Sequence, residues 1–126
     1  MNAHINKHQT AVAILNWNGL KHLQAYLPSV VEHSQGAAHV VVIDNGSSDE
    51  SIIWCQQAFP SVEIIALNEN LGFAGGYNAG LAQINAENYV LLNSDVRVTS
   101  NWIAPVLQAM EKEGFSACQP IIRNDS

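Results

Sequence analysis

The chain has 126 residues, with 5 Lys and Arg against 11 Asp and Glu, and a formal net charge of −6. That length suits a single domain with one core. So acidic a chain is also a poor candidate for binding nucleic acid, because phosphate contacts need clustered cations. Charged residues make up only 13% of the chain, against roughly 25% in an average domain, so we expect part of the surface to be covered.

Targeting and redox features are sparse. No apolar run approaches the roughly 20 residues of a membrane span, and the polar first ten residues lack a signal-peptide core. Two cysteines are too few for a disulfide framework. We therefore expect a soluble, cytoplasmic protein with reduced thiols.

The first predicted strand covers residues 10–15 and is apolar on both faces, as a strand buried under helices would be. Leucines and valines at helical spacing then predict a helix over residues 20–31. Pro28 lies inside that pattern, so we expect a kink or two short helices. Residues 39–43 give the strongest strand signal of the chain.

Ser47 and Glu50 have the spacing of a capping box, and Asp49 and Glu50 are expected in the first turn of the helix that follows. That helix should end near Phe59, because Pro60 follows. Residues 62–67 then form the third predicted strand.

The remaining elements follow the same alternation. Helical spacing is predicted over residues 74–84, and a fourth strand over residues 89–92. Ser100 is predicted to cap a helix that carries the apolar residues of 102–110. Residues 115–118 are compatible with the opening of a fifth strand.

This alternation predicts a three-layer α/β fold with a mostly parallel, open, Rossmann-like sheet. We expect residues 10–126 to form the domain and residues 1–9 to be a flexible N-terminal arm. In such sheets ligands bind beyond the carboxyl ends of the strands, at the point where the strand order reverses.

Polar clusters follow each of the four predicted strands, at residues 16–19, 44–49, 68–76 and 93–95. Because the carboxyl ends of parallel strands share one edge of the sheet, we expect these clusters to form a polar cleft.

Each cluster alone has a simpler explanation. Residues 44–49 are compatible with a turn and a helix cap only. Gly72, Gly75 and Gly76 form either a plain loop or a turn whose N–H groups cradle phosphate. Asp95 is either a turn acid or the carboxylate that holds a divalent metal on a diphosphate.

Together the clusters resemble the nucleotide-binding half of family 2 glycosyltransferases, which have the GT-A fold. The resemblance is carried by residues 13–19, 41–49, 70–80 and 91–96, in order and with natural spacing. Within the family the chain is most similar to rhamnosyltransferase-like members that build bacterial surface polysaccharides.

The resemblance implies a nucleoside-diphosphate sugar, linked to UDP or dTDP, as donor and a saccharide as acceptor. It implies that a nucleoside pocket and a diphosphate site are formed by Leu15, Asn16, Asn18, Asp44, Asn45, Gly72, Gly75, Asn78 and Asn93. It further implies that Asp95 binds Mg²⁺ or Mn²⁺, which would neutralise charge on the departing nucleotide. Trp17 falls in the cleft, where it could stack on the base.

The sequence departs from the family pattern in two places. The first Asp of the Asp-X-Asp metal motif is Asn93 here, so metal affinity is expected to be lower. The family's catalytic base lies well downstream of that motif and is expected beyond Ser126. We therefore expect the donor-binding part of an inverting enzyme of cell-surface polysaccharide synthesis, truncated at its C-terminal side, that works in the cytoplasm or at the inner face of the membrane.

Two other functions differ in how well they fit the sequence. A non-catalytic nucleotide- or partner-binding module of the same fold is the alternative, which Asn93 and the missing base favour slightly. A dinucleotide-dependent oxidoreductase is disfavoured, because no Gly-X-Gly-X-X-Gly follows the first strand. Uncovered apolar surface at residues 115–122 and at the sheet edge also predicts self-association.

Overall fold

The computed structural model describes residues 8–114, 116–119 and 123. Its strands are β1 (His8–Asn16), β2 (His39–Asp44), β3 (Glu63–Ala66) and β4 (Ala86–Leu92), and its helices are α1 (Leu20–Ser34), α2 (Ser51–Ala58), α3 (Gly72–Leu81) and α4 (Ala104–Glu113). All three strand pairings are parallel, in the order β3-β2-β1-β4. The predicted α/β class with a parallel sheet is confirmed.

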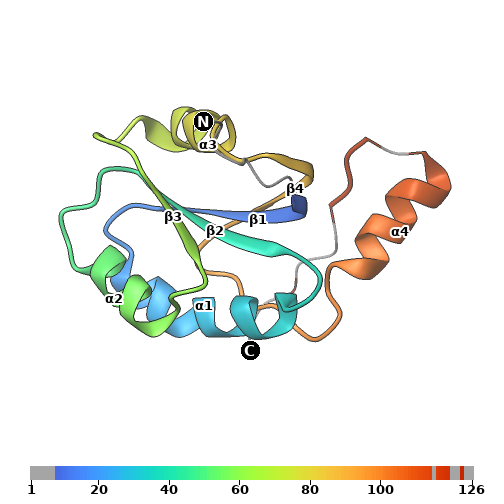
Figure 1. The fold of residues 1–126 in the computed structure, drawn as a ribbon, viewed down its shortest axis with the longest axis horizontal. Helices are drawn as coiled ribbons and strands as arrows, with labels where there is room; N and C mark the ends of the chain where they lie inside the picture. Colours follow the sequence, from blue (N-terminus) through green and yellow to red (C-terminus); the bar gives the residue numbers. More distant parts are fainter. Residues whose placement is uncertain (1–7, 115, 120–122, 124–126) are drawn as a thin grey trace, which may run out of the picture.

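Helices cover both faces of this sheet (Figure 1). The chain runs outward from β1 through β2 to β3, with α1 and α2 on one face, and then returns to the far side of β1 through α3 on the other face. The change of face follows from the right-handedness of parallel crossovers, because the connection now runs in the opposite direction. The strand order therefore reverses between β1 and β4, where ligand sites of such folds lie.

Strand β1 is buried on both faces and separates two cores. Val12 and Ile14 belong to the core under α1 and α2, whereas Ala11 and Ala13 belong to the core under α3. The small side chains on the second face let α3 approach the sheet closely. A Cβ at Gly80 of α3 would overlap the side chain of Ile43, so this helix needs glycine where it crosses β2.

Helix α1 passes through Pro28 as one element, so the two short helices that were considered do not form. Proline removes the bond to the carbonyl four residues earlier, that of Gln24. Gln24 and Pro28 are exposed, so water can bond to the Gln24 carbonyl instead. Leu23, Leu27 and Val30 hold the opposite side of the helix in the core.

Two predicted caps are wrong. Helix α2 begins at Ser51 with no acidic residue in its first turn and no side-chain bond from its N-cap residue, Glu50. The capping box fails because the Ser47 hydroxyl bonds to Asp44 instead.

Helix α4 begins at Ala104 with Pro105 in its first turn, a position that proline favours. Ser100 is therefore not its cap. The buried side chains of Val98 and Ile103 hold the preceding segment against the core, and that anchoring delays the start of the helix.

The ends of other elements also differ from the prediction. Helix α3 stops at Leu81, and Ile84 is buried just beyond it. Residues 116–119 form no strand, and the rest of the predicted fifth strand, at Phe115, lies outside the described residues, as do residues 1–7 of the predicted arm. None of the helices in the described part is long and apolar enough to span a membrane.

Candidate functional site

The carboxyl ends of β1 and β2 are joined by buried polar side chains. Asn16 and Asp44 are directly paired in the strand register and are 1% and 5% exposed. The Asn16 side-chain amide donates to Asp44 Oδ1 at 3.1 Å and to Ser51 Oγ at 2.9 Å. The first two predicted clusters therefore do meet at one edge of the sheet.

Asp44 closes the turn that follows β2. Its Oδ2 accepts the backbone N–H of Ser47 at 3.1 Å, and its Oδ1 accepts the Ser47 hydroxyl at 2.6 Å. This is the local pattern that makes Asp a turn residue. The carboxylate thus holds the turn in place, and only the lone pairs that these bonds leave free could serve a ligand.

Asn18 fastens the loop after β1 to the loop after β2. Its Oδ1 accepts the backbone N–H groups of Ser48 at 2.7 Å and Asp49 at 3.1 Å, and its own N–H donates to Ser47 Oγ at 2.8 Å. Its φ of 48° lies in the left-handed region, which asparagine tolerates better than most residues. Trp17 beside it is exposed.

Asn45 makes the equivalent link to the loop after β3. Its side-chain amide donates to Asn70 Oδ1 at 3.1 Å and to the Gly72 carbonyl at 3.0 Å, and its Oδ1 accepts the N–H of Leu71 at 2.9 Å. Three of the four bonds available to an Asn side chain are therefore used internally. Asn45 therefore joins the loop after β2 to the loop after β3 and keeps only one of its four bonds for a ligand.

The glycines predicted to form a loop lie in the first turns of α3, and the N–H of Gly72, the first residue of the helix, donates to Asn70 Oδ1 at 2.8 Å. Gly72 is exposed and Gly75 is half-buried, and Asn78 is exposed one turn further along. A Cβ at Gly76 would lie 2.8 Å from both Asn45 Nδ2 and Leu15 Cδ1, so this glycine permits α3 to reach the ends of β1 and β2.

Tyr77 of α3 contacts the end of β4 and is not among the predicted site residues. Its hydroxyl donates to the Leu92 carbonyl at 3.1 Å, so it ties α3 to the end of β4 beside the reversal of strand order. Burial raises the pKa of this hydroxyl above its ordinary value, which keeps it a donor. The apolar spacing of α3 predicts a buried ring but gives no signal for this partner.

Asn93 and Asp95 are exposed in the turn directly after β4. Within the described ranges, no group of three or more His, Cys, Asp or Glu residues is placed to hold a metal ion. Mg²⁺ is commonly held by one or two carboxylates with the remaining ligands from phosphates and water. One exposed Asp95 fits that kind of site and does not fit a site made by protein ligands alone.

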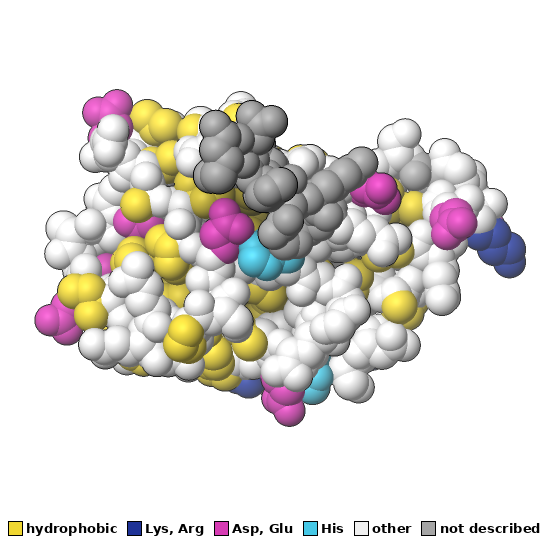
Figure 2. Space-filling view, viewed as in Figure 1, with side chains coloured by type: hydrophobic (Ala, Val, Ile, Leu, Met, Phe, Trp, Pro, Cys, Tyr) yellow, Lys and Arg dark blue, Asp and Glu magenta, His cyan; other side chains and the backbone are white. Residues whose placement is uncertain are grey.

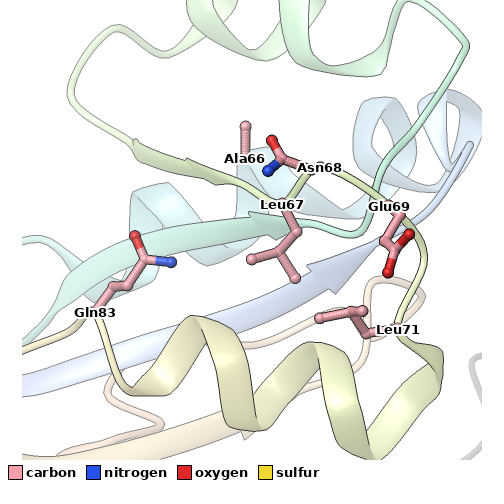
Figure 3. A pocket seen from close by; sticks show the side chains of 6 residues that line it. All are labelled: Ala66, Leu67, Asn68, Glu69, Leu71 and Gln83. Carbon is pink, nitrogen blue, oxygen red and sulfur yellow. The ribbon is translucent and has the colours of Figure 1, made fainter.

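An open hollow of about 500 Å³ lies elsewhere, between the end of β3 and α3 (Figure 3). Leu67 and Leu71 point into it, with Glu69 and Gln83 at opposite ends. None of the residues assigned to the donor site lines it. On the face seen in Figure 2, the described acidic side chains are scattered and the described Lys and Arg side chains gather in no patch.

A parallel sheet in the order β3-β2-β1-β4, covered by helices on both faces, defines an open, Rossmann-like class of α/β domain. Within that class, the family model of glycosyl transferase family 2 matches residues 11–126, and the chain belongs to this family.

A curated relative supports that assignment. The chain is 31% identical over 93 residues to the low-salt glycan biosynthesis hexosyltransferase Agl10 of Haloferax volcanii, an alignment that covers 71% of this chain and 30% of Agl10.

Solved structures share the fold. TarS of S. aureus in complex with UDP-GlcNAc gives a TM-score of 0.73 at 19% identity over 84% of this chain and 32% of TarS. The mannosyltransferase PcManGT of Pyrobaculum calidifontis, in complex with GDP-Man and Mn²⁺, gives 0.64 at 18% identity over 89% of this chain and 33% of that protein. The chain thus has the GT-A fold and spans about a third of the length of these proteins.

Proposed function

We propose that the chain is the donor-binding part of an inverting glycosyltransferase that transfers a sugar from a UDP- or dTDP-linked donor to a saccharide. The observation that carries the proposal is the joined edge of Asn16 and Asp44 beside the first turn of α3. In support, proteins of the same fold are known in complex with UDP-GlcNAc and GDP-Man.

The nucleoside would bind at the ends of β1 and β2. A carboxylate suits the N–H of uracil or thymine, and Asp44 would supply it with a lone pair that its internal bonds leave free. Leu15 and Asn18 would flank it, the first half-buried and the second exposed.

The diphosphate would lie at the start of α3. The N–H groups of a helix's first turn favour anions. Those of Leu71 and Gly72 are bonded to Asn45 and Asn70, so the N–H groups that follow them in the first turn would meet the phosphates, and Gly72 and Gly75 would let a ligand approach that backbone closely. Asn78, exposed one turn on, would reach the sugar.

Asp95, with Asn93 beside it, would hold Mg²⁺ or Mn²⁺ once a nucleotide supplies further ligands. When bound, the metal neutralises charge on the leaving nucleoside diphosphate. With a single carboxylate, metal affinity should depend strongly on the nucleotide.

Calorimetry on Asp95→Ala tests this role. Mn²⁺ should increase the affinity of the wild-type chain for UDP by about tenfold or more, since charge-assisted contacts exceed neutral ones, and Asp95→Ala should lose that increase. Glu111→Gln, an exposed carboxylate on α4, is the matched control and should keep it. An unchanged Mn²⁺ effect in Asp95→Ala would contradict the assignment.

The finer parts of the proposal concern the whole enzyme. Because the chain spans about a third of its relatives, we place the catalytic base and the acceptor site in the remaining length of a full family member. That enzyme would be rhamnosyltransferase-like and would build cell-surface polysaccharide at the inner face of the membrane. The 126 residues alone should bind donor and turn it over little.

A non-catalytic module is the second candidate, and a specific observation favours it. The side chains of Asn16 and Asn45 direct most of their polar atoms inward, to other residues of the chain. Such a module would keep the fold without metal-dependent nucleotide binding, so the Asp95→Ala comparison also separates the two functions.

A further inference from the structure

Asp49 holds the first residues of two helices with one carboxylate. Its Oδ2 accepts the backbone N–H of Leu20, the first residue of α1, at 3.2 Å. Its Oδ1 accepts the backbone N–H of Ser51, the first residue of α2, at 3.0 Å, and also the Ser51 hydroxyl.

Neither helix has a side-chain cap from its own N-cap residue, which is Gly19 for α1 and Glu50 for α2. A carboxylate suits both positions, because helix N-termini carry positive partial charge and unpaired N–H groups. It also has two acceptor oxygens, whereas an amide has one acceptor and one donor group. Asp49 is therefore the residue that supplies a side-chain acceptor to both helices.

These contacts continue into the edge formed by β1 and β2. The Ser51 hydroxyl that donates to Asp49 also accepts the Asn16 side chain at 2.9 Å, and the backbone N–H of Asp49 donates to Asn18. The Asp49 carboxylate thus reaches both ends of the loop after β1, directly at Leu20, which follows the loop, and through Ser51 at Asn16, where the loop begins. The bond to Asn18 comes from the Asp49 backbone.

The other end of the Asn16 side chain contributes little to holding that loop. Asn16 Oδ1 is buried and has no hydrogen-bond partner. A Cβ at Gly19 would lie only 2.5 Å from that oxygen, so the loop is closely folded against it. The loop is held by the bonds of Asn18 to Ser47 and Ser48 and by the contacts that lead to the Asp49 carboxylate.

We propose that Asp49 is a positioning residue: by joining the starts of α1 and α2, it fixes the loop of residues 16–19 against the loop of residues 44–49 in the geometry that binds a nucleoside diphosphate. This inference rests on the proposed function. The hydrogen bonds of Ser51 and Leu20 support it, because they outweigh the effect of burial and lower the pKa of the Asp49 carboxyl, so that it stays ionised.

The test combines two measurements on the 126-residue chain. Backbone hydrogen exchange at Leu20 and Ser51 is followed without nucleotide, and calorimetry measures the affinity for UDP with Mn²⁺. Asp49→Asn keeps the shape but loses one acceptor, so exchange at Leu20 should become about tenfold faster and UDP affinity should fall about tenfold.

Glu50→Gln is the matched control, because Glu50 is the exposed neighbour that caps nothing. It should change neither readout. If Asp49→Asn does not fold, Asp49→Ser takes its place, since a hydroxyl can still accept the Ser51 amide while leaving Leu20 without its partner.

Wild-type UDP affinity in a folded Asp49 variant would overturn the positioning role, even if exchange at Leu20 becomes faster. Unchanged exchange at Leu20 would show that the Asp49 carboxylate does not hold the start of α1. A wild-type chain that binds no UDP would contradict the proposed function instead. Hydrogen exchange at Leu20 would still test whether Asp49 holds the start of α1.

Discussion

At the scale of single residues, the polar side chains at the carboxyl edge of the sheet form a hydrogen-bond network. Asn16, Asp44 and Asn45 are all at most 5% exposed and bond mainly to one another's loops. Buried polar groups need such partners, because an unpaired one costs about 1–3 kcal/mol. Of the residues proposed to bind the donor, Asn18 and Asn78 are exposed.

Sequence patterns located these residues but not their partners. Parallel strands bring their carboxyl ends to one edge, so Asn16 and Asp44 could be placed together from the order of elements alone. Asn16 and Ser51 are 35 residues apart, and Asn18 and Ser48 are 30 apart. Nothing local specifies such pairs, which is why Asp49 was predicted only as a first-turn acid.

Acid titration tests the Asp49 contacts through stability. Because the folded pKa of Asp49 is lowered from 3.8, its contribution is complete above pH 3.8 and is lost as the pH falls through the folded value. At pH 7, Asp49→Asn should lower the free energy of unfolding by about 1 kcal/mol, as loss of a helix cap does.

Urea denaturation at a series of pH values measures this difference. The gap between wild type and Asp49→Asn should shrink below pH 3.8. A gap of constant size from pH 7 to pH 2.5 would contradict the assignment.

The two thiols should differ sharply in reactivity. Burial raises the pKa of Cys55 to about 11, whereas Cys118 is exposed. Since the thiolate is the reactive form, a thiol reagent at pH 8 should label Cys118 in the native chain and Cys55 only after unfolding. Equal labelling rates by mass spectrometry would show that the core around Cys55 is open.

At the scale of elements, the strands were easier to predict than the helix ends. Each of the four predicted strands overlaps its observed strand, because β-branched runs bounded by turn residues are local signals. Helix α4 begins later than predicted because Val98 and Ile103 pack into the core, a tertiary contact that capping rules do not contain.

The close contact between α3 and the sheet gives a prediction at this scale. Gly80→Ala would press a methyl group into Ile43 and should destabilise the fold by about 1–3 kcal/mol, the usual range for overpacking. Gly75→Ala is the control, because its Cβ would meet only Leu71 Cβ at 3.2 Å, and alanine favours helix. Equal thermal stability of the two variants would show that α3 does not depend on this approach.

At the scale of the whole molecule, the sequence predicts the α/β class and its parallel sheet, but not the strand order or which strands lie at the edges. Strand β4 lies at one edge of the described sheet and exposes Tyr89 at 44% and Leu91 at 55% on the α3 side. Exposed apolar edge strands favour association between chains. The low charge of the sequence is consistent with a surface of this kind.

Self-association therefore remains a prediction for the isolated chain. Sedimentation should show dimers or larger species at high concentration, and Leu91→Lys should reduce them, because lysine on an edge strand opposes pairing. Strictly monomeric wild-type chain at the highest concentration measured would contradict this.

The central claim is that this chain binds the nucleotide part of a sugar donor at the carboxyl edge of its sheet. Calorimetry of the wild-type chain with UDP, dTDP and GDP, each with and without Mn²⁺, tests it most directly. We predict weak, Mn²⁺-dependent binding of UDP or dTDP. No binding of any nucleotide at millimolar concentration would contradict the claim.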